Sequence, residues 1–193
     1  MVTSLVLASA SPRRAELLSH LGVEFFVRSA AIDESVRDGE APLSYVRRMA
    51  REKGNAIDLR DGELLLSADT TVIIGGVVLG KPTNLDNART ILQRLSGKRH
   101  EVVTAVCARN EAESKLINVW TEVEFAELSP KLVDDYLKTR EPWDKAGAYA
   151  LQGIAGSFVR RINGSVTNVI GLPLVETREL LGEFGIAATV AGA

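Results

Sequence analysis

The residues of this sequence that could do chemistry are cations, acids and neutral hydrogen-bonding groups placed beside predicted turns and at the ends of predicted elements. Nine stand out: Ser9, Arg13, Arg14, Glu34, Lys53, Asp69, Thr70, Lys81 and Gln152. The four cations can hold the charged oxygens of a polyphosphate. The carboxylates can bind a hard divalent cation and orient a water, and the neutral groups can read a base or a sugar. Together they predict the hydrolysis of a phosphate ester.

The two arginines follow an apolar run and a turn of small hydroxyl residues. Residues 5–8 predict a strand buried on both faces, and Ser11 predicts a helix cap with Pro12 at the first helical position. Free N–H groups and the helix dipole would favour a phosphate beside Arg13 and Arg14. The two side chains project about 100° apart, so we expect Arg13 to face the ligand and Arg14 to support it. The alternative is a capped helix with solvated arginines.

Lys53 lies within a helix predicted over residues 42–58, on the same face as Val46 and Ala50. A lysine that points inward needs an anionic partner. The alternative is that its stem follows the rim of the core while the ammonium stays in water. Glu34 lies in an acidic turn, where a solvated carboxylate is the simpler interpretation.

Asp69 and Thr70 follow residues 64–68, which predict a buried strand that ends on these two polar residues. The glycine pair at 75–76 then predicts a two-residue hairpin turn. Lys81 comes at the exit of that hairpin. A carboxylate at a strand end, with a lysine twelve residues later, favours a functional role for both residues.

The remaining patterns predict further strands and helices. The predicted strands cover residues 23–30, 100–109 and 116–128, and the predicted helices cover residues 85–96, 132–139 and 172–183. Asn163 and Gly164 predict a hairpin turn between strands over 158–162 and 165–170. Residues 187–193 predict a short strand or a frayed end. Segment 141–158 is rich in glycine and contains Gln152, which is typical of a loop that closes over a ligand. His100, alone at a strand start, is interpreted as structural.

Length and composition indicate one ordinary globular domain over residues 1–193. The chain has 46% hydrophobic and 25% charged residues and a net charge of -2, which argues against a nucleic-acid surface. Its single cysteine excludes an internal disulfide. No signal peptide and no apolar run of the ~20 residues needed to cross a bilayer are visible, so we expect a cytoplasmic protein without membrane partners. The motifs GxxxxGK[ST], GxGxxG and GxSxG are missing, and two histidines with one cysteine cannot build a typical zinc site.

Eight blocks of the sequence together resemble the Maf family of nucleoside triphosphate pyrophosphatases. In chain order they are LASASPRR, IDES, AREK, SADT, GKP, DKAGAYALQG, INGS and GLPLVET, and they span Leu7 to Thr177. The resemblance implies an α/β fold in which a long, mixed and twisted sheet with helices on both sides forms two lobes around a central cleft, distantly akin to the inosine triphosphate pyrophosphatases. It also implies a homodimer.

The same resemblance implies roles for the site residues. Asp69 corresponds to the proposed general base, and Arg13, Thr70 and Gln152 match positions that distinguish substrate subgroups; here they resemble the subgroup that acts on dTTP and UTP. Cleavage between the α and β phosphates would give a monophosphate and pyrophosphate.

Physical roles can be assigned beside that resemblance. Lys53 and Lys81 would assist Arg13 in neutralising the triphosphate, and Glu34 with Asp69 would bind Mg²⁺ or Mn²⁺. Asp69 would take the proton of the water itself or act through the metal.

Two alternatives stay open at this stage. One is a pyrophosphatase for inosine or xanthosine triphosphate, which would use similar phosphate chemistry. The other is a nucleotide-sensing regulator of cell division, which would bind in the same cationic site without turnover. A carboxylate beside a triphosphate argues against the regulator, because it would repel the ligand unless a cation intervenes.

Overall fold

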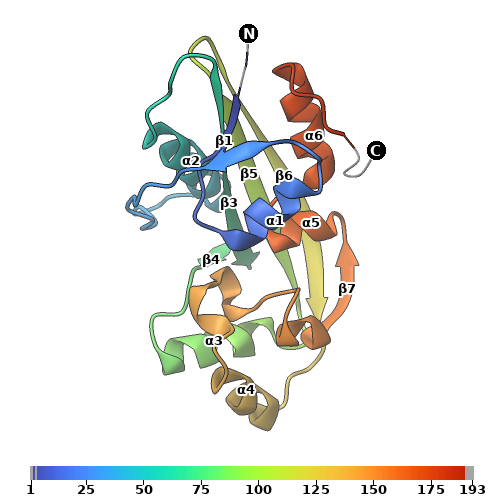
Figure 1. Cartoon of the computed structure of the whole chain (residues 1–193). Coiled ribbons are helices and arrows are strands. Elements are labelled where there is room, and N and C mark those ends of the chain that lie inside the picture. The colour runs from blue at the N-terminus through green and yellow to red at the C-terminus, as the bar shows by residue number, and fades with distance from the viewer. Residues whose placement is uncertain (1, 3, 190–193) are drawn as a thin grey trace. The chain divides into compact units, whose positions relative to one another are not determined.

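The computed structural model describes residue 2 and residues 4–189 as a mixed α/β protein (Figure 1). Its strands are β1 (Ser4–Leu7), β2 (Phe25–Val27), β3 (Glu63–Ile74), β4 (Val77–Leu79), β5 (Arg99–Arg109), β6 (Ser114–Phe125) and β7 (Val159–Asn163). Its α-helices are α1 (Pro12–Ser19), α2 (Pro42–Asn55), α3 (Leu85–Leu95), α4 (Pro130–Leu137), α5 (Val166–Ile170) and α6 (Leu174–Glu183). Three short 3₁₀ turns follow α4: η1 (Pro142–Asp144), η2 (Ala146–Ala148) and η3 (Ile154–Phe158).

The seven strands form one mixed sheet in the order β2-β1-β3-β5-β6-β7, with β4 paired to β3. Strand β1 runs parallel to both neighbours, with Leu7 opposite Val27 of β2 and Leu66 of β3. The pairs β3 with β4 and β6 with β7 are antiparallel. The predicted mixed α/β fold is therefore confirmed. No helix in the described part of the chain is both long enough and apolar enough to cross a bilayer.

The chain divides into two compact units. Unit 1 comprises residues 1–69, 104–119 and 171–193, and unit 2 comprises residues 70–103 and 120–170. Strands β3, β5 and β6 each contribute residues to both units. The single-domain organisation and the central cleft stay predictions.

Each unit has its own core. In unit 1 it includes Val6, Leu65 and the fully buried Met49. In unit 2 the core is aromatic: Phe125 meets Tyr149 edge to face at 4.9 Å between ring centres, and α3 packs against α4 and η2. Each large apolar side chain that is fully buried contributes about 2 kcal/mol to stability.

Several predicted elements are confirmed, with ends shifted by one to three residues. Ser11 caps α1 by accepting a hydrogen bond from the Arg14 amide at 3.4 Å, as expected. The turn at Gly75 and Gly76 joins β3 to β4, and both glycines have positive φ, which suits a two-residue hairpin turn. Residues 187–189 form neither helix nor strand, and the rest of the predicted tail element lies outside the described residues.

Two expectations about strand ends are wrong. Strand β3 does not end at Asp69 but continues to Ile74, because Thr70, Thr71 and Val72 are β-branched and favour the pleated backbone. The Asn163–Gly164 pair does not join two strands, since α5 follows it.

The start of α5 is fixed by side chains rather than by a hairpin. Ser165 Oγ accepts a hydrogen bond from the Asn168 amide, as a helix cap does. The buried Asn168 side chain donates to Val102 O at 3.0 Å and to Thr121 Oγ1 at 2.9 Å. These contacts stabilise a helix where local sequence indicates a strand.

Candidate functional site

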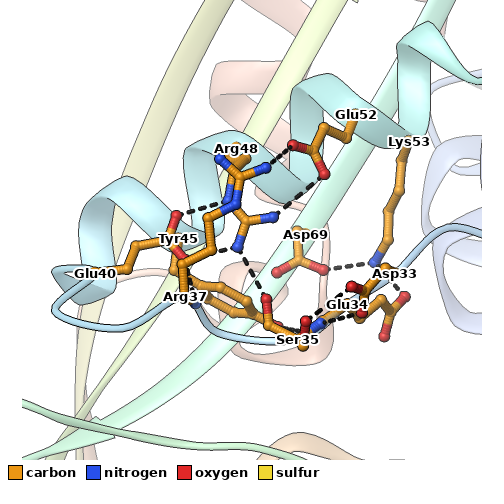
Figure 2. Close-up of polar contacts among 10 residues, drawn as sticks. All are labelled: Asp33, Glu34, Ser35, Arg37, Glu40, Tyr45, Arg48, Glu52, Lys53 and Asp69. Atoms are coloured by element: carbon orange, nitrogen blue, oxygen red, sulfur yellow. Dashed lines mark hydrogen bonds and ion pairs between the residues drawn. The ribbon is translucent and has the colours of Figure 1, made fainter.

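Lys53, Asp69 and Glu34 come together in unit 1 (Figure 2). Lys53 Nζ lies 2.6 Å from Asp69 Oδ1 and 2.8 Å from Glu34 Oε1. The lysine projects from the last turn of α2, the aspartate from the middle of β3, and the glutamate from the loop that joins β2 to α2. The expectation that an inward lysine has anionic partners is confirmed.

Burial strengthens this trio. The side chains of Asp69 and Lys53 are 10% and 16% exposed, and that of Glu34 is 38% exposed. Charge interactions at such sites are screened less than at the surface. Asp69 and Lys53 are thus held in place, while Glu34 forms the side that is open to solvent.

The start of α1 supplies the two arginines to the same unit. Arg14 Nε donates to Gly171 O at 2.9 Å, and one of its terminal nitrogens donates to Ser9 Oγ at 3.3 Å. Burial lowers the pKa of the Arg14 guanidinium, and the negative charges of Asp69 and Glu34 oppose that shift.

The charge of Arg13 also lowers the pKa of Arg14. The arginines therefore share one electrostatic neighbourhood with the two acids. Arg14 is tied to the backbone and to Ser9, which suits the supporting role expected of it. A nucleotide-facing role for Arg13 stays a prediction.

The carboxylates of Asp69 and Glu34, which both contact the Lys53 ammonium, are the type of ligand that a hard divalent cation prefers. No cluster of three or more histidine, cysteine or acidic residues within residue 2 and residues 4–189 could hold a metal ion. Mg²⁺, however, is commonly bound by one or two carboxylates together with substrate phosphates and water. Glu34 and Asp69 fit that pattern, and their binding of Mg²⁺ or Mn²⁺ stays a prediction.

Thr70, Lys81 and Gln152 belong to unit 2. Lys81 is exposed directly after β4, where the Gly80 carbonyl accepts a hydrogen bond from the Gly147 amide at 3.1 Å. Gly147 has φ +70 and lies so close to Val72 that a Cβ would be 3.0 Å from its side chain. The loop that leads to Gln152 is thereby fixed between β3 and the segment that carries Lys81.

Glu141 is a residue that sequence reasoning missed. Its carboxylate accepts hydrogen bonds from the amides of Ile154, at 2.7 Å, and Ala155, at 3.0 Å, and from the Tyr136 hydroxyl. It also lies against Gly153, where a Cβ would be 2.2 Å from the carboxylate. Glu141 thus fixes the backbone just after Gln152. The contact spans 13 and 14 residues, so no short-range pattern indicates it.

His100 is buried in the aromatic core of unit 2, as a structural residue should be. Its Nε2 is 2.9 Å from the Tyr149 hydroxyl, and its other ring nitrogen has no partner among the described residues. Burial lowers its pKa to about 4. A protonated ring would carry two N–H donors in this dry environment, so the neutral form is favoured.

The depressed pKa of His100 predicts a pH-dependent stability. His100 takes up a proton near pH ~6.5 in the unfolded chain but only near 4 in the folded chain. The stability that the neutral His100 ring contributes is therefore fully present above the unfolded pKa. It is lost as pH falls through the folded pKa, by on the order of 3 kcal/mol. We expect the free energy of unfolding, measured by urea denaturation at a series of pH values, to depend less steeply on pH in His100→Gln than in the native chain. His20→Gln, at the exposed end of α1, is the matched control and should keep the pH dependence of the native chain.

Known proteins resemble this chain over nearly its whole length. The family model described as Maf-like protein matches residues 4–184. A protein of Anaeromyxobacter dehalogenans (strain 2CP-1 / ATCC BAA-258) named dTTP/UTP pyrophosphatase is 53% identical over 189 residues, which cover 96% of each chain. One of the same name from Pseudoalteromonas atlantica (strain T6c / ATCC BAA-1087) is 50% identical over 188 residues, covering 95% of this chain and 98% of the relative.

A solved structure supports the fold. The Staphylococcus aureus Ham1 protein matches with a TM-score of 0.51 and 15% identity, over 94% of this chain and all of that one. The two relatives are much closer in sequence, and the family match covers the blocks in which the site residues lie. This chain belongs to the family of Maf-like proteins.

Proposed function

We propose that this protein hydrolyses dTTP and UTP to the monophosphate and pyrophosphate, and so removes triphosphates from the nucleotide pool. The observation that carries the proposal is the Lys53 ammonium held between Asp69 and Glu34, beside the arginines of α1. The names of relatives that are half identical to this chain support the choice of nucleotides.

The proposed reaction uses the chain's own charges. Arg13, Lys53 and Lys81 bind the triphosphate and neutralise its oxygens. Asp69 orients a water and takes its proton as the water oxygen bonds to the α phosphorus. The bond from that phosphorus to the oxygen bridging to the β phosphorus breaks, and pyrophosphate leaves with the electron pair.

The proposal includes a divalent cation held by Glu34 and Asp69. When bound, Mg²⁺ or Mn²⁺ would neutralise part of the phosphate charge and make water more acidic. The carboxylate oxygens are the ligands that such cations prefer. Removal of the metal with EDTA should then abolish pyrophosphate release, and added Mg²⁺ or Mn²⁺ should restore it.

The test of the function is a panel of nucleotides with Mg²⁺ or Mn²⁺. We expect equal amounts of monophosphate and pyrophosphate from dTTP and UTP, at a kcat/KM at least tenfold above that for inosine, xanthosine and 7-methylguanosine triphosphates. Faster release from inosine or xanthosine triphosphate would favour that specificity instead. Tight nucleotide binding with no turnover would favour a regulator, and release of inorganic phosphate would mean that another bond is cut.

Base recognition is assigned to Gln152. Its amide has a donor and an acceptor and so matches O4 and N3–H of uracil or thymine, whereas an ionised glutamate has no donor. Gln152→Glu should therefore lower kcat/KM for dTTP and UTP by about 10- to 100-fold. Measuring both nucleotides by pyrophosphate release checks this, and unchanged values would remove Gln152 from base recognition.

The proposal places the enzyme in the cytoplasm as a homodimer. Nucleotide pools are its substrate source, and Cys107 is buried as a free thiol. Light scattering should give twice the 20.8 kDa of one chain; a mass of one chain would contradict the dimer.

A further inference from the structure

The loop that carries Glu34 has no buried apolar residue. It joins β2 to α2, and every apolar residue of the described segment 28–41 is half-buried or exposed. A segment with so little buried apolar surface opens easily unless polar contacts hold it. The 2.8 Å contact of Glu34 with Lys53 must therefore depend on such contacts.

Arg48 donates three of the hydrogen bonds that hold the loop (Figure 2). Its Nε and Nη2 donate to the two carboxylate oxygens of Glu40, each at 2.6 Å, in a bidentate pair. Nη2 also donates to the carbonyl of Ser35, next to Glu34, at 2.9 Å. The side chains of Arg48 and Glu40 are only 14% and 10% exposed. Arg48 therefore binds the C-terminal end of the loop, at Glu40, and its middle, at Ser35, to α2.

Glu40 stays charged under ordinary conditions. Hydrogen bonding from Arg48 is the largest cause that lowers its pKa to about 2. The tie to Arg48 thus persists at neutral pH and in mild acid.

Tyr45 provides a second tie on the same helix. Its hydroxyl donates to the carbonyl of Glu34 at 2.9 Å, and its ring lies 5.6 Å from the Arg48 guanidinium carbon. Residues three apart share a helix face, so Tyr45 and Arg48 form one surface against the loop. Helix α2 thus holds the backbone around Glu34 and also presents Lys53, the charge partner of its carboxylate.

We propose that Arg48, assisted by Tyr45, is a positioning residue that holds Glu34 against Lys53 and Asp69 for pyrophosphate release; its catalytic meaning rests on the proposed function. Arg48 donates four hydrogen bonds to Glu40, Ser35 and Glu52. It therefore acts through the loop and not by contact with the phosphates.

The activity test uses Arg48→Gln, with Arg51→Gln as the matched control, because Arg51 is an exposed arginine of the same helix. We expect Arg48→Gln to lower kcat for dTTP by about tenfold, since small misplacements of a catalytic group are costly, with KM changed less than about threefold. Arg51→Gln should keep the native values. In a Glu34→Gln background, Arg48→Gln should cost less than a further factor of about two. An equal loss in both backgrounds would overturn the proposal.

A second measurement is independent of turnover. Hydrogen exchange of segment 29–41 should be faster in Arg48→Gln, while exchange in β3 stays as in the native chain. If Arg48→Gln does not fold, Tyr45→Phe replaces it in this test, because it removes only the hydroxyl that donates to the Glu34 carbonyl. Tyr45→Phe should accelerate hydrogen exchange around Glu34. Unchanged exchange in a folded variant overturns the positioning role. If hydrogen exchange is faster in Arg48→Gln but the native chain releases no pyrophosphate, the result supports the positioning of the loop by Arg48 and refutes only the proposed function.

Discussion

Asp69→Asn is expected to lower kcat/KM for dTTP by about three orders of magnitude, within the range that general base catalysis contributes. The substitution keeps the size of the side chain and its acceptor oxygen but removes the charge that orients a water and accepts its proton. It also weakens the contact with the Lys53 ammonium, 2.6 Å away. Pyrophosphate release under single-turnover conditions separates this loss from any change in product release.

A control with the same chemistry is available in the turn before β3. Asp61 is exposed, and Asp61→Asn should leave kcat/KM within about twofold, because surface charges contribute little. Circular dichroism should show both variants folded. If a folded Asp69→Asn kept more than a tenth of the native rate, Asp69 would not be the base.

The positions on one helix were predictable because helical periodicity is local. The 3.6-residue repeat orients Lys53 inward, and the structure gives it two anionic partners. The capping by Ser11 and the Gly75–Gly76 turn follow from local backbone chemistry in the same way. These features need no knowledge of distant residues.

What could not be predicted depends on contacts between distant segments. Asn163 and Gly164 carry a strong hairpin signal, but Asn168 finds buried partners on β5 and β6 and the chain turns into α5 instead. The ties of Glu141 to the loop after Gln152 likewise join groups 13 and 14 residues apart. Sequence patterns indicate periodicity and turn-forming residues, and neither predicts hydrogen bonds between side chains and groups that are distant in the sequence.

The site itself was only partly predictable. The sequence patterns selected Glu34 and Asp69 as acids of interest, and the structure brings both to Lys53. They did not indicate Arg48, because its partner Glu40 lies in a loop without regular spacing. Thr70, Lys81 and Gln152 lie in the other unit, and their part in the site stays a prediction.

Lys53→Met is expected to lower kcat/KM for dTTP by about 100- to 1,000-fold, because it removes a cation from the triphosphate site and leaves two carboxylates without their common partner. Lys138→Met is the matched control, since Lys138 pairs with Asp135 on the exposed face of α4 and should tolerate the change. Lys53→Arg should recover part of the loss by restoring the charge.

The double variant of Lys53→Met with Asp69→Asn separates two roles of the lysine. If Lys53 serves only to hold Asp69, the double variant should be no slower than Asp69→Asn alone, because the group being positioned is already gone. If Lys53 also binds phosphate, its loss should raise KM for dTTP further in the Asp69→Asn background. The Lys53 ammonium has three N–H donors and so has hydrogen-bonding capacity beyond its contacts with Asp69 and Glu34, and we therefore expect the second result. A double variant identical to Asp69→Asn in both kcat and KM would confine Lys53 to positioning.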